Sequence, residues 1–404
     1  MKFLLKQLHK QKHLFEPGGK LELLYPLYEA QETFLFTPDD VTKGPPHVRD
    51  GLDMKRAMIM VVIALIPPTL FAIYNAGHQY NVVNQVADAT FLTHVIQGAL
   101  IVLPIILVSY IVGGLLEVAF CIIRKHEVNE GFLVTGLLFP LTLPPTIPLW
   151  QVAVGIAFGV VIGKEIFGGT GFNVLNPALT ARAFLFFAYP AQISGDQVWT
   201  KVADQSEVIE GFTGATPLAV AAAAPEGSSV IEVLNEAGFT LNSMATGLIG
   251  GSLAETAVWA SLIGAVILIL SGIGSWRIMA GGVIGLALCS TAMNMLPADS
   301  FSPFTQLPFH YHLVMGSAMF GLVYMATDPV SAAATNRGKW IYGTMIGVLI
   351  ILIRVANPAY AEGVMLAILF MNVMAPMIDH YVVEAHVRKR RADIKARKVS
   401  HAQG

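Results

Sequence analysis

The stretch VLNPA at residues 174–178 is repeated as VANPA at residues 355–359, 181 residues further along the chain. Upstream of it, LVTG at 133–136 is matched by LVMG at 313–316, 180 residues later. Two matches at nearly the same spacing predict an internal repeat, so the chain is built from two similar halves. If each half contains five membrane helices, the halves run in opposite directions because five is odd, as in many transporters built from inverted repeats.

The composition is that of a membrane protein. Of the 404 residues, 54% are hydrophobic and only 13% are charged, and the mean hydropathy is +0.62. An ordinary soluble protein contains about 25% charged residues. These values exclude a soluble enzyme, a disordered chain and a coiled coil, and the net charge of -2 gives no indication of a nucleic-acid partner.

Ten apolar segments follow a polar and basic N-terminal region, each at membrane length or slightly below it. The third and the eighth are short and end beside prolines, which predicts half-helices or broken helices rather than straight spans. The fold class is therefore an all-α polytopic membrane protein with ten transmembrane helices in two inverted five-helix repeats. The segments are 57–75, 95–122, 131–146, 149–166, 174–190, 256–272, 277–296, 311–327, 340–354 and 361–382.

Positive charge is concentrated at the two ends of the chain. Of the 25 Lys and Arg, nine fall in residues 1–56 and seven in residues 388–398, and the first twenty residues lack the sustained apolar core of a signal peptide. By the positive-inside rule, both termini are expected in the cytoplasm. This predicts a cytoplasmic segment 1–56, a first repeat 57–190, a periplasmic loop 191–255, a second repeat 256–382 and a basic cytoplasmic tail 383–404.

The long acidic loop contains the tetrapeptide TGAT at residues 213–216. Thr216 supplies a hydroxyl, Gly214 and Ala215 leave room for close approach, and N–H groups of a turn can face a phosphate. The pattern suits covalent attachment of a phosphoryl group. An ordinary turn that begins at Thr213 is the alternative.

Glu117 stands in the apolar run IVGGLLE at residues 111–117. A carboxylate near the bilayer centre costs about 2.5–3.5 kcal/mol and is therefore usually functional or paired. The alternative is that Glu117 lies near the inner end of its helix and pairs with Arg124 or Lys125. Gly113 and Gly114 allow a flat ring or a second helix to approach the backbone closely.

Two further features have both a functional and a non-functional interpretation. The Asn-Pro-Ala sites break helices at membrane depth and expose backbone polar groups, or serve the fold alone. Asp379 at the inner end of the last helix offers hard oxygen ligands for a cation, or is a solvated interfacial carboxylate. No metal site is expected, because Cys121 and Cys289 are too few and His310 and His312 form the only close histidine pair.

The chain resembles, from end to end, the B-subunit family of the Na+-translocating NADH:quinone oxidoreductase. TGAT looks like the flavin-attachment motif of that family, [ST]GAT, with Thr213 where Ser is common. The homologous D subunits of Rnf complexes are shorter and lack the N-terminal region. The other stretches that carry the resemblance are HLFEPGGK (13–20), HVRD (47–50), RKHEVNEGF (124–132), GGTGFNVLNPAL (168–179), FFAYPAQISGD (186–196) and MATDPVSA (325–332).

The resemblance implies a membrane component of a six-subunit respiratory complex in the bacterial inner membrane. NADH is oxidised on another subunit, ubiquinone is reduced, and Na+ is exported from cytoplasm to periplasm. The family carries FMN through a phosphoester bond to the last Thr of its motif, here Thr216, installed by a separate flavin transferase. It also holds a non-covalent riboflavin, for which Asn173 and Asn176 are the candidate contacts. Gly113, Gly114 and Glu117 correspond to a quinone site, with Glu117 catalytic, and Asp379 to Na+ capture.

Two alternatives to this function remain open. One is an Rnf-type D subunit. The other is a passive channel or solute transporter, because paired Asn-Pro-Ala motifs resemble aquaporins and the ten-helix plan resembles urea channels. A channel has no use for a flavin, so yellow colour on the denatured polypeptide separates these classes.

Overall fold

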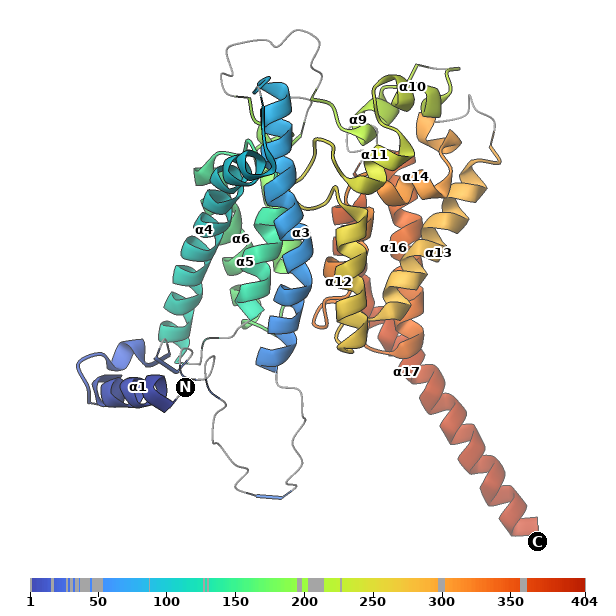
Figure 1. Cartoon of the computed structure of the whole chain (residues 1–404). Helices are drawn as coiled ribbons and strands as arrows, with labels where there is room; N and C mark the ends of the chain where they lie inside the picture. Colours follow the sequence, from blue (N-terminus) through green and yellow to red (C-terminus); the bar gives the residue numbers. More distant parts are fainter. Residues whose placement is uncertain are drawn as a thin grey trace.

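The fold is known from a computed structural model, shown in Figure 1. Regular structure in the residues that it describes is helical throughout, without a strand. The described residues are 2–15, 18–26, 28–29, 32, 36, 44–45, 54–86, 88–125, 128, 131–194, 198–202, 214–225, 227–296, 302–356 and 362–403.

All ten predicted apolar segments contain helix. Six helices are long and apolar enough to cross a membrane, which makes the chain a polytopic membrane protein. Three shorter apolar helices accompany them, α5 (Gly131–Leu141), α7 (Pro177–Ala188) and α12 (Val258–Leu270). The long ones are α3 (Met54–Val83), α4 (Phe91–Arg124), α6 (Leu149–Val161) with η2 (Glu165–Phe167), α13 (Trp276–Met293), α16 (Asn336–Ala356) and α17 (Val364–Gln403).

The outward face of α4 is as apolar as its buried face. Leu100, Leu107, Ile111 and Leu115 recur at helical spacing and are 57–67% exposed. A helix that is apolar on all sides belongs to a large core or to a membrane. No other part of the described chain buries this face. Lipid is therefore its natural solvent.

The eighth apolar segment is interrupted. Helix α14 (Phe309–Val314) stops before Met315, Gly316 adopts a φ of +69°, and the chain then resumes as α15 (Ala318–Phe320) and the π-helical turn η4 (Gly321–Met325). A glycine is suited to that left-handed conformation because it has no Cβ. The segment is broken, as its length and flanking proline predict.

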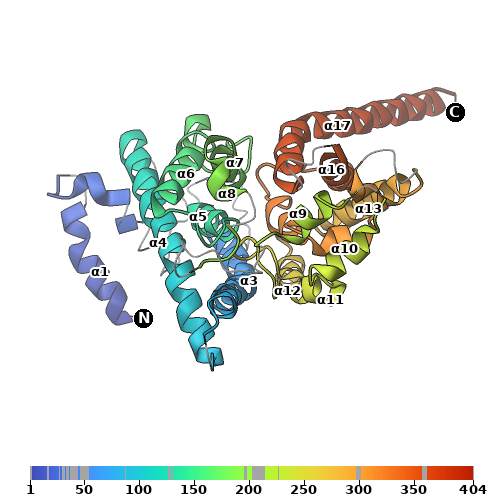
Figure 2. The ribbon, with the colours of Figure 1, turned by 90° about the horizontal axis from the view of Figure 1, so that it is seen from above.

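The helices form two groups, which Figure 2 separates when the molecule is seen from above. One contains α3 to α7 and the other α12 to α17. They meet where α3 packs against α12 and where α7 packs against α17. The first helix of one group thus contacts the first helix of the other, and the last contacts the last.

The connection between the groups has structure of its own. It contains α8 (Pro190–Ile193), α9 (Pro217–Ala222), α10 (Val230–Glu236) and α11 (Leu241–Thr246). The apolar side chains of α9, α10 and α11 share a small core with η3 (Pro303–Gln306) and α14. This cap lies at one end of the bundle, hereafter the cap end (Figure 1).

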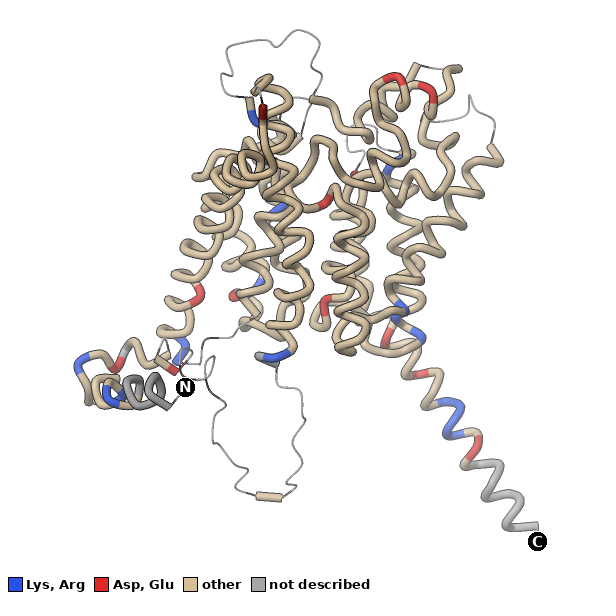
Figure 3. Tube along the Cα trace, in the orientation of Figure 1, with Lys and Arg blue, Asp and Glu red and all other residues tan. Residues whose placement is uncertain are grey.

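The opposite end, hereafter the tail end, is where α17 continues beyond the bundle. Lys and Arg gather there in Figure 3, along the projecting part of α17 and at the ends of α3, α4 and α16. The N-terminal helix α1 (Lys2–Phe15) and the turn η1 (Glu22–Leu24) lie at this end too. The charge asymmetry that the sequence predicts therefore has a spatial counterpart.

Candidate functional site

A cavity of about 360 Å³ opens at the cap end between the two groups of helices, hereafter the Thr216 cavity. Its volume is in the range of about 300–1,000 Å³ that is typical of small-molecule sites. Thr216 lines it together with the aromatic side chains of Phe186 and Trp199. Its charged lining residues are Arg182, Glu255 and Glu362.

Thr216 is half-buried and stands directly before α9. Its Oγ1 accepts a hydrogen bond of 3.2 Å from the backbone N–H of Ala219, so it is the N-cap of that helix. Gly214 and Ala215 precede it and are also half-buried. Thr213 lies outside the described residues.

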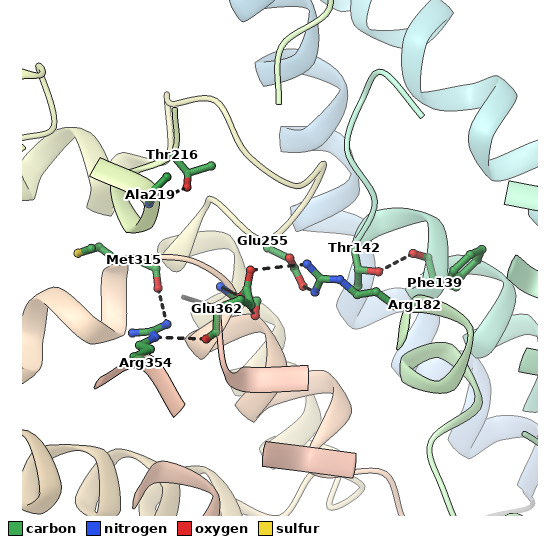
Figure 4. Close-up of polar contacts among 10 residues, drawn as sticks. Phe139, Thr142, Arg182, Thr216, Ala219, Glu255, Met315, Arg354 and Glu362 are labelled. Atoms are coloured by element: carbon green, nitrogen blue, oxygen red, sulfur yellow. Dashed lines mark hydrogen bonds and ion pairs between the residues drawn. The ribbon is translucent and has the colours of Figure 1, made fainter. Parts of the chain in front are cut away.

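Arg182 lies between two carboxyl groups that come from distant parts of the chain (Figure 4). Its Nη1 is 2.9 Å from Oε1 of Glu255, and its Nη2 is 3.6 Å from Oε2 of Glu362. Arg182 is 5% exposed and Glu255 4%. A buried charge without a partner is costly, so the three side chains depend on one another.

The first Asn-Pro-Ala motif sets the position of Arg182. Asn176 is the N-cap of α7, and its Oδ1 accepts hydrogen bonds from the backbone N–H groups of Ala178 and Leu179 at 3.0 and 3.3 Å. Pro177 occupies the first helical position, where its missing N–H has no cost. The motif therefore begins a helix that carries Arg182 toward the Thr216 cavity.

Glu255 is positioned by an extended segment just before α12. The N–H groups of Leu253 and Ala254 donate to the carbonyl oxygens of Leu143 and Leu141, both at 3.0 Å. These carbonyls lie at the end of α5, where no intrahelical partner is available. The end of α5 thus fixes the backbone that presents Glu255.

Glu362 belongs to the second group of helices. Its carboxylate accepts a hydrogen bond of 2.8 Å from the N–H of Ser317 and another from the Ser317 hydroxyl. Arg354, which is fully buried, donates to the carbonyl oxygens of Glu362 at 3.2 Å and Met315 at 3.0 Å. The break between α14 and α15 is thereby held against the start of α17.

The two carboxyl groups at Arg182 have opposite pKa shifts. Burial raises the pKa of Glu255 to about 8, although Arg182 acts to lower it and Glu362 raises it further. Burial alone would also raise the pKa of Glu362, but Arg182 and the hydrogen bonds from Ser317 bring it below its ordinary value. The pKa of Glu362 therefore lies below that of Glu255.

A second, smaller cavity of about 60 Å³ lies between the groups, hereafter the Asn176 cavity. Asn173, Asn176, Lys164 and Asp328 are among its lining residues. Asn173 donates to the carbonyl oxygen of Leu175 at 3.0 Å. Its polar groups suit a flavin ring chemically, but its volume is well below that of a small-molecule site.

Glu117 is paired, but with neither of the two residues expected from the sequence. Nζ of Lys164 donates to both carboxylate oxygens of Glu117, at 2.6 and 2.7 Å. Arg124 instead contacts Glu165, with a distance of 3.2 Å from Nη1 to Oε2. The turn η2 brings Lys164 and Glu165 beside the last turns of α4, so adjacent residues reach different partners.

The space beside Gly113 is filled by the protein itself. A Cβ at this position would lie 2.5 Å from ring atoms of Phe132. A Cβ at Gly114 would lie 3.6 Å from the same ring, in ordinary contact. The flat ring that approaches the Gly113 backbone is therefore that of Phe132.

Asp379 is not near either cavity. Its Oδ2 accepts from the N–H of Ala334 at 2.6 Å, and its Oδ1 accepts from the N–H of Thr335 at 3.0 Å and from the Thr335 hydroxyl. Both oxygens thus satisfy donors at the N-terminus of α16. No cluster of three or more His, Cys, Asp or Glu that could hold a metal occurs in the described ranges.

The sequence motifs led to Thr216, Asn173, Asn176 and Glu117 but not to the cluster around Arg182. Arg182 and Arg354 did carry a signal, because each is a charge inside an apolar segment. Glu255 and Glu362 were not singled out: Glu255 is the last residue of the predicted loop, and Glu362 stands at the very start of the tenth predicted segment. Only the tertiary structure brings Glu255 and Glu362 to one guanidinium.

A model of the NQR2, RnfD, RnfE family matches residues 41–388. A protein of Stutzerimonas stutzeri (strain A1501), named as the B subunit of Na(+)-translocating NADH-quinone reductase, is 50% identical over 407 residues, which cover 95% of this chain and 98% of that protein. Proteins with the same name from Pseudomonas aeruginosa (strain UCBPP-PA14) and Yersinia pestis are each 48% identical, again with 95% and 98% covered.

Proposed function

The chain belongs to the NQR2, RnfD, RnfE family, and on that premise we propose that it is the B subunit of a Na+-translocating NADH:quinone reductase and carries FMN on Thr216. The observation that carries the proposal is the position of Thr216. The terminal Thr of the TGAT motif lines a cavity of about 360 Å³ whose lining includes two aromatic and three charged side chains.

The residues around the cavity fit a flavin. Bound FMN would supply one-electron and two-electron transfer. Thr216 offers the hydroxyl for the phosphoester, and Phe186 and Trp199 offer apolar surface for an aromatic ring system. Arg182 provides a positive charge on the polar side.

A separate flavin transferase installs the FMN, because an unactivated Thr hydroxyl is a poor nucleophile. In the reaction, Oγ1 of Thr216 forms a bond to the phosphorus of the FMN half of FAD. The pyrophosphate bond breaks, AMP leaves, and the hydroxyl proton is lost to a base of the transferase. Thr216 lies at the cap end, so attachment follows membrane insertion.

Electrons leave the flavin toward ubiquinone at the tail end, and transfer is coupled to export of Na+ from cytoplasm to periplasm. We assign Gly113, Gly114 and Glu117 to the quinone site, with the buried Glu117–Lys164 pair as its ionisable part. Asp379 is assigned to Na+ capture. Riboflavin at Asn173 and Asn176 requires the Asn176 cavity to widen.

The proposed topology has ten spans in two inverted repeats with both ends in the cytoplasm of a bacterium. Contacts between equivalent helices, α3 with α12 and α7 with α17, support a two-fold relation of the halves. Lys and Arg at the tail end support its cytoplasmic orientation (Figure 3). The other subunits of the complex supply NADH oxidation, since no nicotinamide-binding motif occurs in this sequence.

Two other functions are less well supported. A D subunit of an Rnf complex shares the family, but the relatives at 48–50% identity over nearly the whole chain are named as B subunits of the reductase. A channel or solute transporter would have no reason for a hydroxyl of a flavin motif at a cavity of ligand size.

Fluorescence in a denaturing gel tests the proposal. We expect the subunit from purified complex to fluoresce as a flavoprotein, Thr216→Ala to abolish the signal, and the matched control Thr213→Ala to retain it. A colourless wild-type subunit in active complex would contradict the proposal and favour a channel.

A further inference from the structure

The Thr216 cavity has a polar floor built from two almost completely buried groups. Arg182 and Glu255 are 5% and 4% exposed, and both line the cavity. They contact each other through Nη1 and Oε1 at 2.9 Å. A guanidinium and a carboxyl group are thus presented side by side to whatever occupies the space under Thr216.

The carboxyl group of Glu255 has hydrogen-bonding capacity left over. Its Oε2 is buried and makes no hydrogen bond of ordinary geometry with the described residues, although the Ser252 side chain lies close enough to lower the pKa of the carboxyl group. Leaving a buried polar oxygen unsatisfied costs about 1–3 kcal/mol. Native proteins keep such groups at sites where a ligand or water completes the bonding.

A donor next to an acceptor selects a particular chemical class of ligand. A cation is disfavoured because Arg182 already supplies a positive charge at the same point. The complement is a planar edge that alternates carbonyl oxygens with an N–H group. The pyrimidine edge of an isoalloxazine ring has this pattern, with carbonyl oxygens on both sides of the ring N3–H.

We propose that Arg182 and Glu255 bind the pyrimidine edge of the flavin that Thr216 carries. Arg182 donates to a ring carbonyl oxygen, and Oε2 of Glu255 accepts from the ring N3–H. This inference rests on the proposed function, because it takes the flavin at Thr216 as given. It adds the residues that orient the ring and set its redox potential.

Charge at this edge determines how easily the flavin is reduced. Reduction places negative charge on the pyrimidine part of the ring, and a nearby positive charge stabilises that form. Arg182 therefore raises the potential of the flavin. Glu362, which lines the same cavity 3.6 Å from the other arm of Arg182, lowers it.

The two charges thus predict changes of opposite sign, which a purely structural role would not produce. Arg182→Gln removes the positive charge and lowers the potential of the covalent flavin. Glu362→Gln removes a negative charge with little change in shape and raises it. Arg182→Lys keeps the charge but not the planar fork, and its potential falls between wild type and Arg182→Gln.

The test is a redox titration of the covalent flavin in the purified complex, with mediators and dithionite as reductant. We expect at least a tenfold change in the one-electron equilibrium constant for Arg182→Gln and for Glu362→Gln, which is about 59 mV. Arg277→Gln is the matched control. It makes the same charge change at the start of α13. The 13-residue α12 separates this position from Glu255, which corresponds to about 20 Å along the bundle.

Gel fluorescence of each variant is recorded first and separates the two proposals. A wild-type subunit without covalent flavin contradicts the proposed function. Covalent flavin with an unchanged potential in Arg182→Gln, or with shifts of the same sign in both variants, contradicts this inference alone. If Arg182→Gln does not assemble, the sign of the shift in Glu362→Gln decides, and a fall or no change overturns the inference.

Discussion

Lys164 places its ammonium group 2.6 and 2.7 Å from the two carboxylate oxygens of Glu117, and the two side chains are 3% and 2% exposed. The pair joins α4 to the chain that follows α6. A carboxylate in an apolar helix is thereby compensated by a lysine from a different element, not by the cations that follow it in sequence. This pairing determines how substitutions at Glu117 must be interpreted.

Glu117→Ala leaves Lys164 as a buried cation without this partner, and breaking one side of a buried pair costs about 3–5 kcal/mol. We expect a lower apparent Tm of the complex and impaired quinone reduction, with the covalent flavin still present in the gel. The double variant Glu117→Gln/Lys164→Met should recover most of the stability but not the quinone reduction. Full turnover and unchanged inhibitor sensitivity in the double variant would return the pair to a purely structural role.

Alanine substitutions at Gly113 and Gly114 test helix packing and quinone binding separately. Gly113→Ala brings a Cβ to 2.5 Å from the Phe132 ring, and overpacking of this kind costs about 1–3 kcal/mol. Gly114→Ala makes an ordinary contact at 3.6 Å and should leave the Tm unchanged. If these glycines belong to the quinone site, Gly114→Ala changes the KM for quinone or the inhibitor response at constant Tm; an unaltered KM and response would remove Gly114 from that site.

Asp379 is expected to serve both α16 and Na+. Asp379→Ala removes acceptors from the N–H groups of Ala334 and Thr335 and, like the loss of a helix cap, costs about 0.5–2 kcal/mol. Asp379→Asn keeps one carbonyl oxygen and loses the charge. A role in Na+ capture predicts that Asp379→Asn raises the Na+ concentration needed for half-maximal turnover, whereas the same Na+ dependence as wild type would leave only the capping role.

Glu255 makes stability depend on pH in a direction that can be worked out. Burial raises its pKa to about 8 from an ordinary value of 4.5. Between these values the folded protein holds a proton that the unfolded chain has lost, so its contribution to stability is full below pH 4.5 and is lost as the pH rises to about 8. The uncharged Glu255→Gln should therefore gain Tm relative to wild type across this window, and the difference should level off above it. Parallel Tm profiles of the two proteins in detergent would rule out the raised pKa.

Much of the helical architecture could be predicted because membrane helices satisfy their own backbone and are recognisable as apolar runs. The interruption near Gly316 was predicted because its apolar segment is too short to span the membrane as a straight helix. The structured cap at 214–257 was not, since its helices are short and stabilised by contacts with η3 and α14 rather than by their own sequence. The available sequence signal was Thr216, an N-cap residue that stands directly before Pro217 at the first position of α9.

One short motif was enough to single out Thr216, which lines the larger cavity. The cluster around Arg182 was not predictable, because its partners come from separate elements. Glu255 and Glu362 lie more than a hundred residues apart and meet at Arg182 only because α7 packs against α17 and the end of α5 holds the segment before α12. The choice of Lys164 over Arg124 as the partner of Glu117 likewise depends on the turn at η2.

The central claim is that Thr216 carries FMN by a phosphoester bond. Peptide mass spectrometry of the subunit from active complex tests it most directly. We expect the peptide containing residues 213–216 to have the mass of the unmodified peptide plus FMN less water, with fragment ions that assign the addition to Thr216. An unmodified peptide from fully active complex, or an addition on Thr213, would contradict the claim.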